Sequence, residues 1–345
     1  MILYVCSKET DYLQDLTYAG LAEMLGKERI FEVPRRPSYH NERKFVLGPR
    51  YDYPQNLGFT QGKRPPAPRD VELIVLASAK PDALETFAGL MESSRAPWVF
   101  VDGGDRREIG GDFERTGGRA CFDRFRQICN QRKPAVIFKR ELWTGEESDG
   151  PVPFPFSFKS GKSGDTLLNS CELSRVSPDP SKTMDVLFWA VESSLTRKRA
   201  FEILRGRYDC GKNGSVPDRK ARRYSRKGEK YFAALASAKI CLSFRGEGFD
   251  TLRYWEIPAS GSFMISESPV IRIPENFENG TQAVFCRPDL SDLTDKIDYY
   301  LRNEKEREEI AAAGRGHLLA RHTHLARAEY FIAKVKERLG LKFPC

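Results

Sequence analysis

Apolar residues recur along the chain in two alternating patterns, short buried runs and longer segments at helical spacing. The first seven residues are mostly apolar, and 11–25 then carries leucines three to five positions apart before Gly26. Further buried runs predict strands at 30–33, 72–77, 98–102 and 135–139. Helical spacing between them predicts helices at 82–93 and 121–131. Strands that alternate with helices indicate a parallel, doubly wound sheet.

The same alternation resumes after polar stretches rich in Gly and Pro at 145–155, 160–165 and 177–182. Strands are predicted at 184–191, 239–244, 262–266 and 283–286. Helices are predicted at 195–204, 230–237, 251–259, 290–303, 305–320 and 324–339. We therefore expect two Rossmann-like α/β domains, followed by a C-terminal helix that packs back toward the first domain. The predicted bounds are 1–178, 179–322 and 323–345.

One polar, Pro-rich excursion interrupts the first domain at 34–70. It predicts either a substrate-binding loop or an ordered surface loop without a function, and the residues do not decide between them.

The chain has 345 residues, with 56 Lys and Arg against 48 Asp and Glu, so its formal net charge is +8. This charge indicates an anionic partner: nucleic acid, a phosphate-rich small molecule or a membrane surface. The surplus is local, because 195–230 holds 13 Lys and Arg against four Asp and Glu. The rest of the chain is close to neutral.

The eight cysteines form no C-x-x-C pair, and several lie inside apolar runs. This usage is typical of reduced cysteines in a cytosolic protein. The start of the chain lacks a basic region and a small-residue cleavage site, and no run of 18 apolar residues occurs. We expect a cytoplasmic protein, and peripheral contact with the inner face of a membrane stays open.

The stretch 231–267 carries the most chemistry. It reads as a helix, a buried strand, the loop Arg-Gly-Glu-Gly-Phe-Asp-Thr at 245–251, a second helix and another strand. Ligands of open α/β sheets bind beyond the carboxyl ends of strands, and the following helix offers free N–H groups to an anion. Gly246 allows close backbone approach, Thr251 is expected to cap the helix or bond a phosphate, and Arg245 is suited to pair a phosphate bidentately. Asp250, one of the two acids of this loop, is a further candidate for ligand binding.

This stretch resembles the donor-binding core of GT-B glycosyltransferases, in particular the exostosin-like and spore-maturation-type "glycosyl transferases group 1" branch. The resemblance rests on SAKICLSFRG at 237–246, RYWE at 253–256, ASG at 259–261 and FMI at 263–265, with a similar ending in AAAGRGHLLARHTHLARAEYF. It extends over about 184–332 and implies two Rossmann-like domains facing across a cleft.

The resemblance implies that Glu256 hydrogen-bonds the ribose of a nucleotide sugar and that Arg245 and Arg253 contact its diphosphate. The basic cluster that includes Arg197 and Arg199 is expected to add positive charge there. Retaining GT-B enzymes have two glutamates eight positions apart, but Gly stands at position 248 of this chain. Retention or inversion therefore stays open.

The first domain is then expected to hold the acceptor. Asp11, where the loop after the first strand meets the first helix, and Asp102, at the end of a buried strand, are the candidate proton acceptors. Helix capping or turn formation is the alternative for each. The run Asp-Gly-Gly-Asp at 102–105 suits Mg²⁺ or Mn²⁺, but the resemblance implies that no metal or other cofactor is required. Three histidines at 317, 322 and 324 lack the spacing of a zinc site.

These features predict a glycosyltransferase that moves a hexosyl or pentosyl group from a nucleotide diphosphate sugar, such as a UDP-sugar, to an acceptor. Polysaccharide, lipid-linked glycan, protein and a modified nucleobase all stay open as acceptors. The alternatives are a basic nucleic-acid-binding protein on a Rossmann-like scaffold, based on the segment 195–230, and a glycosyltransferase-like domain without catalysis.

Overall fold

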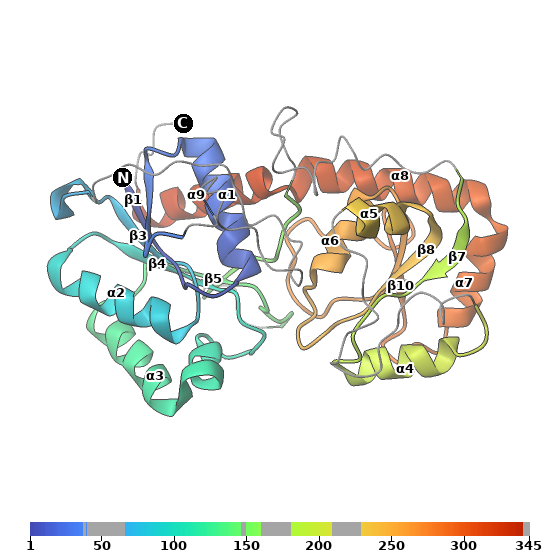
Figure 1. The fold of residues 1–345 in the computed structure, drawn as a ribbon, viewed down its shortest axis with the longest axis horizontal. Coiled ribbons are helices and arrows are strands. Elements are labelled where there is room, and N and C mark those ends of the chain that lie inside the picture. Colours follow the sequence, from blue (N-terminus) through green and yellow to red (C-terminus); the bar gives the residue numbers. More distant parts are fainter. Residues whose placement is uncertain (37–38, 40–65, 146–149, 160–180, 209–228, 341–345) are drawn as a thin grey trace.

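The computed structural model describes residues 1–36, 39, 66–145, 150–159, 181–208 and 229–340. They form two α/β lobes that lie side by side, each built on its own parallel sheet (Figure 1). The predicted domain boundary at 178/179 lies outside the described residues.

The first lobe has a sheet with strand order β2-β1-β3-β4-β5-β6, in which every pairing is parallel. Its strands are β1 (Ile2–Val5), β2 (Ile30–Val33), β3 (Leu73–Leu76), β4 (Trp98–Asp102), β5 (Val136–Lys139) and β6 (Val152–Pro153). Its helices are α1 (Tyr12–Leu25), α2 (Pro81–Ser93), α3 (Gly111–Gln131) and the short 3₁₀ helix η2 (Pro68–Asp70). The strand order reverses direction between β1 and β3, and ligands of such sheets bind beyond the strand ends at this switch point.

The second lobe has a parallel sheet with strand order β10-β9-β8-β7. Its strands are β7 (Met184–Leu187), β8 (Ala238–Ser243), β9 (Phe263–Glu267) and β10 (Val284–Cys286). The helices of this half are α4 (Leu195–Leu204), α5 (Glu229–Ala236), α6 (Leu252–Ala259), α7 (Leu293–Arg302), α8 (Glu304–Arg321) and α9 (His324–Leu339).

The last helix, α9, returns to the first lobe and packs against α1 (Figure 1). The approach is close at Gly20, because a Cβ atom there would lie 2.3 Å from the carbonyl oxygen of His324. The imidazole Nε2 of His324 also lies 3.0 Å from Oε2 of Glu23. A glycine on α1 thus lets the C-terminal helix dock on the first lobe.

Helix α3 differs from its predicted bounds, since it begins at Gly111 rather than at 121. Its first turns contain few apolar residues, so helical spacing does not reveal them. Gly118, with φ of +77°, then interrupts the helical backbone before the amphipathic part continues. The polar break predicted at 145–155 likewise contains a strand, the short edge strand β6.

Alternate phenylalanines join the lobes where the chain leaves the first sheet. The ring of Phe154 lies 4.9 Å from that of Phe138 in the first lobe, and the ring of Phe158 lies 5.9 Å from that of Phe232 in the second. All four belong to one apolar cluster that is continuous across both lobes. Since these rings share one buried cluster, the lobes are held by more than the connecting chain.

A short ladder of backbone hydrogen bonds also links the lobes. Arg272 N donates to the carbonyl of Leu142 at 2.7 Å, and Thr144 N donates to that of Val270 at 2.8 Å.

No helix among the described residues has the length and apolar character needed to cross a membrane. The cysteines of that same part of the chain are free thiols: Cys6, Cys121, Cys129, Cys241 and Cys286.

Candidate functional site

The carboxyl ends of the two sheets face each other across the lobe boundary. The loop 245–251, which joins β8 to α6 as predicted, contacts the residues that follow β4 and β5. Arg140 Nη1 donates to the carbonyl of Asp250 at 2.6 Å, and Arg115 Nη1 lies 3.9 Å from Oε2 of Glu247. Because polar strand ends of both lobes meet here, this is the candidate site.

Arg245 is anchored at the end of β8 and keeps a partly exposed side chain. Its backbone N donates to Oε1 of Glu267 at 2.6 Å, and its Nε lies 3.3 Å from the other carboxylate oxygen. Nε also donates to the hydroxyl of Thr196 at 3.0 Å. The guanidinium carbon lies 4.4 Å from the ring centre of Phe249, and 35% of the side chain is exposed. The arrangement orients a cation that solvent and ligands can reach.

The N-terminus of α4 lies beside this cation. Ser194 caps the helix by accepting from Arg197 N at 3.2 Å, and its hydroxyl donates to the carbonyl of Arg245 at 2.8 Å. Arg197 is buried, with Nε donating to the carbonyl of Phe244 at 3.1 Å and Nη1 to that of Val191 at 3.0 Å. Arg197 therefore holds the loops in place, and its Nη2 would lie 3.4 Å from a Cβ built on Gly246.

Arg199, by contrast, is on the exposed face of α4. Within the described part of the chain, no hydrogen bond or ion pair connects Arg199 with the 245–251 loop. The structure thus brings Arg197, Arg245 and Gly246 together and leaves Arg199 apart from them.

Helix α6 carries the predicted ribose-binding residue. The hydroxyl of Tyr231, on α5, donates to Oε2 of Glu256 at 2.8 Å. Burial raises the pKa of Glu256, while this hydrogen bond and the nearby charge of Arg253 oppose the shift. Arg253 and Glu256 are both partly buried, so the pair is not a simple surface ion pair.

Thr251 occupies the N-cap position of α6, but its side chain makes no capping hydrogen bond. Its Oγ1 is buried and has no hydrogen-bond partner within the described part of the chain. A buried hydroxyl without a partner costs free energy unless something bonds it. The predicted capping role of Thr251 is therefore not observed. Among the described residues, the hydroxyl has no protein partner that competes with its predicted bond to a phosphate.

Asp250 has a structural setting that its place in the loop does not reveal. Its carboxylate accepts from Phe156 N at 2.5 Å and from Trp255 Nε1 at 2.8 Å. Burial raises its pKa to about 7, against the opposing charge of Arg140. Because both oxygens accept from protein donors and 2% of the residue is exposed, the geometry ties α6 to the first lobe instead of offering a carboxylate to a donor substrate.

Asp11 lies at the switch point of the first sheet. Its Oδ1 caps α1 by accepting from Gln14 N at 3.2 Å, and its Oδ2 accepts from the hydroxyl of Ser78 at 2.6 Å. Ser78 follows β3, so this hydrogen bond joins the loops on either side of the reversal. The residue is partly exposed, so it combines a capping role with access to solvent.

Asp102 is fully buried at the end of β4. Its carboxylate accepts from Gly104 N at 3.1 Å and from Gly110 N at 2.7 Å, and it lies 3.1 Å from Nζ of Lys139. These contacts match turn formation, the alternative to the predicted role of Asp102 as proton acceptor. The carboxylate shapes the loop 103–110 and pairs a buried lysine, so its geometry favours a structural role.

The site also contains residues to which the sequence analysis assigns no role, among them Ser78, Glu141, Tyr231 and Glu267. Glu267 ends a buried strand, and Glu141 and Ser78 each follow one by two residues, which is the general signal for a site at strand ends. No local pattern marks Tyr231, because its partner Glu256 is on another helix.

Several predictions fall on residues that the structure does not describe. The excursion 34–70 is described only at its ends, where Tyr39 donates to Asp15 Oδ1 at 2.5 Å and Arg36 Nη2 lies 3.6 Å from the same oxygen. Most of the basic segment 195–230 also lies outside the described residues. Within the described ranges, no three His, Cys, Asp or Glu side chains are grouped as metal ligands.

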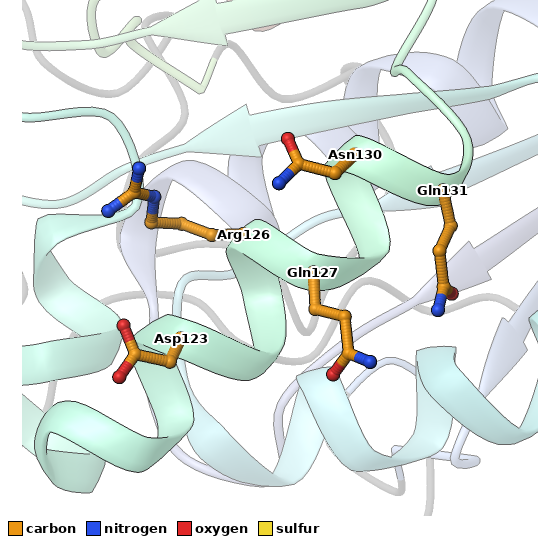
Figure 2. A pocket seen from close by; sticks show the side chains of 5 residues that line it. All are labelled: Asp123, Arg126, Gln127, Asn130 and Gln131. Carbon is orange, nitrogen blue, oxygen red and sulfur yellow. The ribbon is translucent and has the colours of Figure 1, made fainter.

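A hollow of about 380 Å³ lies on the exposed face of α3, lined by Asp123, Arg126, Gln127, Asn130 and Gln131 (Figure 2). All five side chains come from one helix. The end of α3 leads into the start of β5, so the hollow extends toward the amino edge of the sheet, away from the strand ends where the lobes meet. We place no donor site there.

Comparison with known proteins supports the architecture. The Anabaena Alr3699/HepE structure in complex with UDP-glucose is similar over 97% of this chain and 99% of that chain, with 11% identity and a TM-score of 0.56. An alpha-glucosyltransferase in complex with UDP and a 13-mer DNA containing a HMU base is also similar over 97% of this chain and 99% of that chain. The identity is 7% and the TM-score is 0.54. The chain has the GT-B fold. This confirms the predicted fold class.

The GT-B chain also matches one family model over residues 193–333, described as glycosyl transferase-like. No curated protein matches the sequence. The match begins after β7 and covers the rest of the second lobe, including the candidate donor loop, and the first part of α9. The exostosin-like and spore-maturation-type branch stays a prediction.

Proposed function

We propose that this protein is a glycosyltransferase that binds a UDP-sugar on the second lobe and transfers the sugar to an acceptor on the first. The observation that carries the proposal is the meeting of Arg245, the N-terminus of α4 and Gly246 at one strand end of the second lobe. Hexosyl and pentosyl transfer, and retention and inversion, are left open.

The diphosphate is assigned to the space beside Arg245. The guanidinium is oriented by Thr196 and Glu267 and is partly exposed, and the positive end of the α4 dipole lies beside it. Positive charge at this point stabilises the diphosphate as the bond to the sugar breaks. Glu256, held by Tyr231, is assigned to the ribose hydroxyls, and Arg253 on the same helix to the diphosphate.

The acceptor is assigned to the switch point of the first sheet. In the transfer, the anomeric carbon loses its bond to the diphosphate oxygen and gains one to an acceptor oxygen, and the acceptor proton must leave. Asp11 is the proton acceptor that we assign, because it is partly exposed and Ser78 orients it. Asp102 is left out of this role because it is buried and its oxygens bond to Gly104, Gly110 and Lys139.

The comparisons support this proposal over a nucleic-acid-binding protein without catalysis. The matched family model is glycosyl transferase-like, and the similar structures were obtained with UDP-glucose and with UDP. The DNA in one of them keeps a modified nucleobase among the acceptor classes to be tested. A cytoplasmic location and contact with an anionic membrane surface belong to the proposal as well.

Calorimetry with UDP tests the donor site. The variants Glu256→Ala and Arg253→Ala should weaken UDP binding and abolish turnover while the protein stays folded. Glu108→Ala and Arg126→Ala, both on exposed positions of the first lobe, are the matched controls. Unchanged UDP affinity in both site variants would refute the proposal. A thermal-shift panel of UDP, GDP, ADP, CMP and TDP identifies the base, because a ligand that binds the folded state raises the unfolding temperature.

A further inference from the structure

One carboxylate of the first lobe bonds two neighbouring amides of the loop that is assigned to the diphosphate. Glu141 follows β5 in the first lobe, and its Oε2 accepts from Phe249 N at 3.0 Å while its Oε1 accepts from Asp250 N at 2.9 Å. Consecutive amides of the loop are therefore held by the two oxygens of one side chain. A charged acceptor makes these hydrogen bonds stronger than neutral ones.

Glu141 is itself fixed within the first lobe. Its side chain is 2% exposed, and its Oε1 lies 3.2 Å from Nη1 of Arg140. Arg140 is buried as well, donates from Nε to the carbonyl of Gly103 at 2.8 Å and pairs with Asp105. The carboxylate is therefore held in place by the first lobe, and Arg140 adds its own hydrogen bond to the loop at the carbonyl of Asp250.

Gly248 is shaped to this carboxylate. A Cβ atom built on Gly248 would lie 2.5 Å from Oε1 of Glu141 and 2.8 Å from Oδ1 of Asp105. Side chains of the first lobe thus fill the space that any larger residue at 248 would need. This accounts physically for glycine at the position where the sequence lacks an acid.

The held amide leads directly to the cation of the site. Phe249, whose N–H bonds Glu141, packs its ring against the guanidinium of Arg245, with the ring centre 4.4 Å from the guanidinium carbon. Trp143, also of the first lobe, contacts the same ring edge-to-face at 5.9 Å. The first lobe therefore positions Phe249, and the ring of Phe249 packs against the guanidinium of Arg245.

We propose that Glu141 is a positioning residue, through which the first lobe sets the conformation of the 245–251 loop and so the strength of donor binding by the second lobe. The role in donor binding rests on the proposed function, whereas the hold on the loop does not. The donor site is then complete only while the lobes are in contact, so the site for the acceptor and the site for the donor are coupled mechanically.

Hydrogen exchange and UDP calorimetry on the full chain test this proposal. In Glu141→Ala the amides of 245–251 should exchange about ten- to a hundredfold faster, as expected when charge-assisted hydrogen bonds are lost. Strand β8 and helix α9 should be unaffected. UDP should bind at least about tenfold more weakly. Glu141→Gln keeps one acceptor oxygen and should fall between Glu141→Ala and the wild type, and Glu108→Gln is the exposed control.

Gly248→Ala provides an independent variant, since it keeps Glu141 and displaces the loop by its added Cβ. It should raise exchange in 245–251 in the same way, and it decides the question if Glu141→Ala does not fold. Unchanged exchange of 245–251, or a rise spread equally over both lobes, overturns the positioning role. If exchange rises in 245–251 but the UDP affinity is unchanged, the link between Glu141 and donor binding is overturned. Absence of UDP binding in the wild type refutes the donor assignment, and with it this link, while exchange still decides the hold on the loop.

Discussion

The side-chain nitrogen of Lys139 lies 3.1 Å from Oδ2 of Asp102, and both side chains are almost completely buried. Removing one partner of such a pair leaves an uncompensated charge in the interior. We expect Asp102→Asn to lower the free energy of unfolding by about 3–5 kcal/mol. Urea denaturation measures the loss.

The exposed ion pair of Arg119 and Asp123 on α3 provides the control for this prediction. Asp123→Asn should cost at most about 1 kcal/mol, because surface pairs contribute little. If Asp102→Asn kept its stability and lost all turnover, Asp102 would be the catalytic group that the sequence predicts, and the structural role would be wrong.

Asp11→Asn separates capping from proton transfer. Asn is as good an N-cap as Asp, so the change in unfolding free energy should stay below about 1 kcal/mol. Loss of the proton acceptor should lower turnover by at least about a hundredfold. The readout is sugar transfer or, without an acceptor, hydrolysis of the donor. Ser78→Ala, which removes only the orienting hydroxyl, should have a smaller effect. Full turnover in Asp11→Asn would show that another group accepts the proton.

Glu267→Gln is expected to tighten UDP binding. The carboxylate of Glu267 offsets part of the positive charge of Arg245, and Gln keeps an acceptor for the backbone N–H. Partly exposed pairs of this kind contribute about 0.2–1 kcal/mol, so affinity should rise by at most about fivefold. The gain should shrink in high salt, which calorimetry at two ionic strengths would reveal. Weaker binding would instead mean that the orienting effect of Glu267 on Arg245 outweighs the charge that it offsets.

Two buried groups should give the unfolding free energy opposite dependences on pH. Burial raises the pKa of Asp250 to about 7, so the folded state holds a proton that the unfolded state releases near pH 4. The stability contributed by Asp250 is therefore lost as pH rises through this window. Burial lowers the pKa of His322 to about 3, so its contribution is lost as pH falls below about 6.5.

The contributions of these groups oppose each other in the wild type between about pH 4.5 and 6.5, at up to about 1.4 kcal/mol per pH unit each. Relative to the wild type, Asp250→Asn should lose stability on acidification, and His322→Gln should gain it. Urea denaturation across this range measures both slopes. Slopes equal to that of the wild type in both variants would contradict the assigned protonation states.

The elements themselves could be predicted because their signals are local. Buried runs such as 98–102 and 239–244 report burial on both faces of a strand, and glycines with an arginine between a strand and a helix mark the 245–251 loop. The first turns of α3 and the edge strand β6 were not predicted, because they are short or polar and bury little apolar surface.

The partners of the charged residues could not be predicted in this way. Asp102 and Asp250 look like ligand-binding carboxylates in the sequence. In the fold, however, the carboxylate of Asp102 pairs with Lys139, and that of Asp250 accepts a hydrogen bond from the backbone of Phe156. Nothing near Glu141 shows that it bonds a loop more than 100 positions later. Such contacts depend on how closely the lobes approach.

The sequence by itself thus determined the parallel α/β halves, the loop with Arg245 and Gly246, and the place of Glu256 on the helix that follows, since each depends on neighbours within a few turns of chain. Only the tertiary structure decided which carboxylates stay open to a substrate and which are buried partners, because burial and pairing arise when residues distant in sequence are packed together. Glu141 and Gly248 show this most directly: their fit exists only where the two lobes meet.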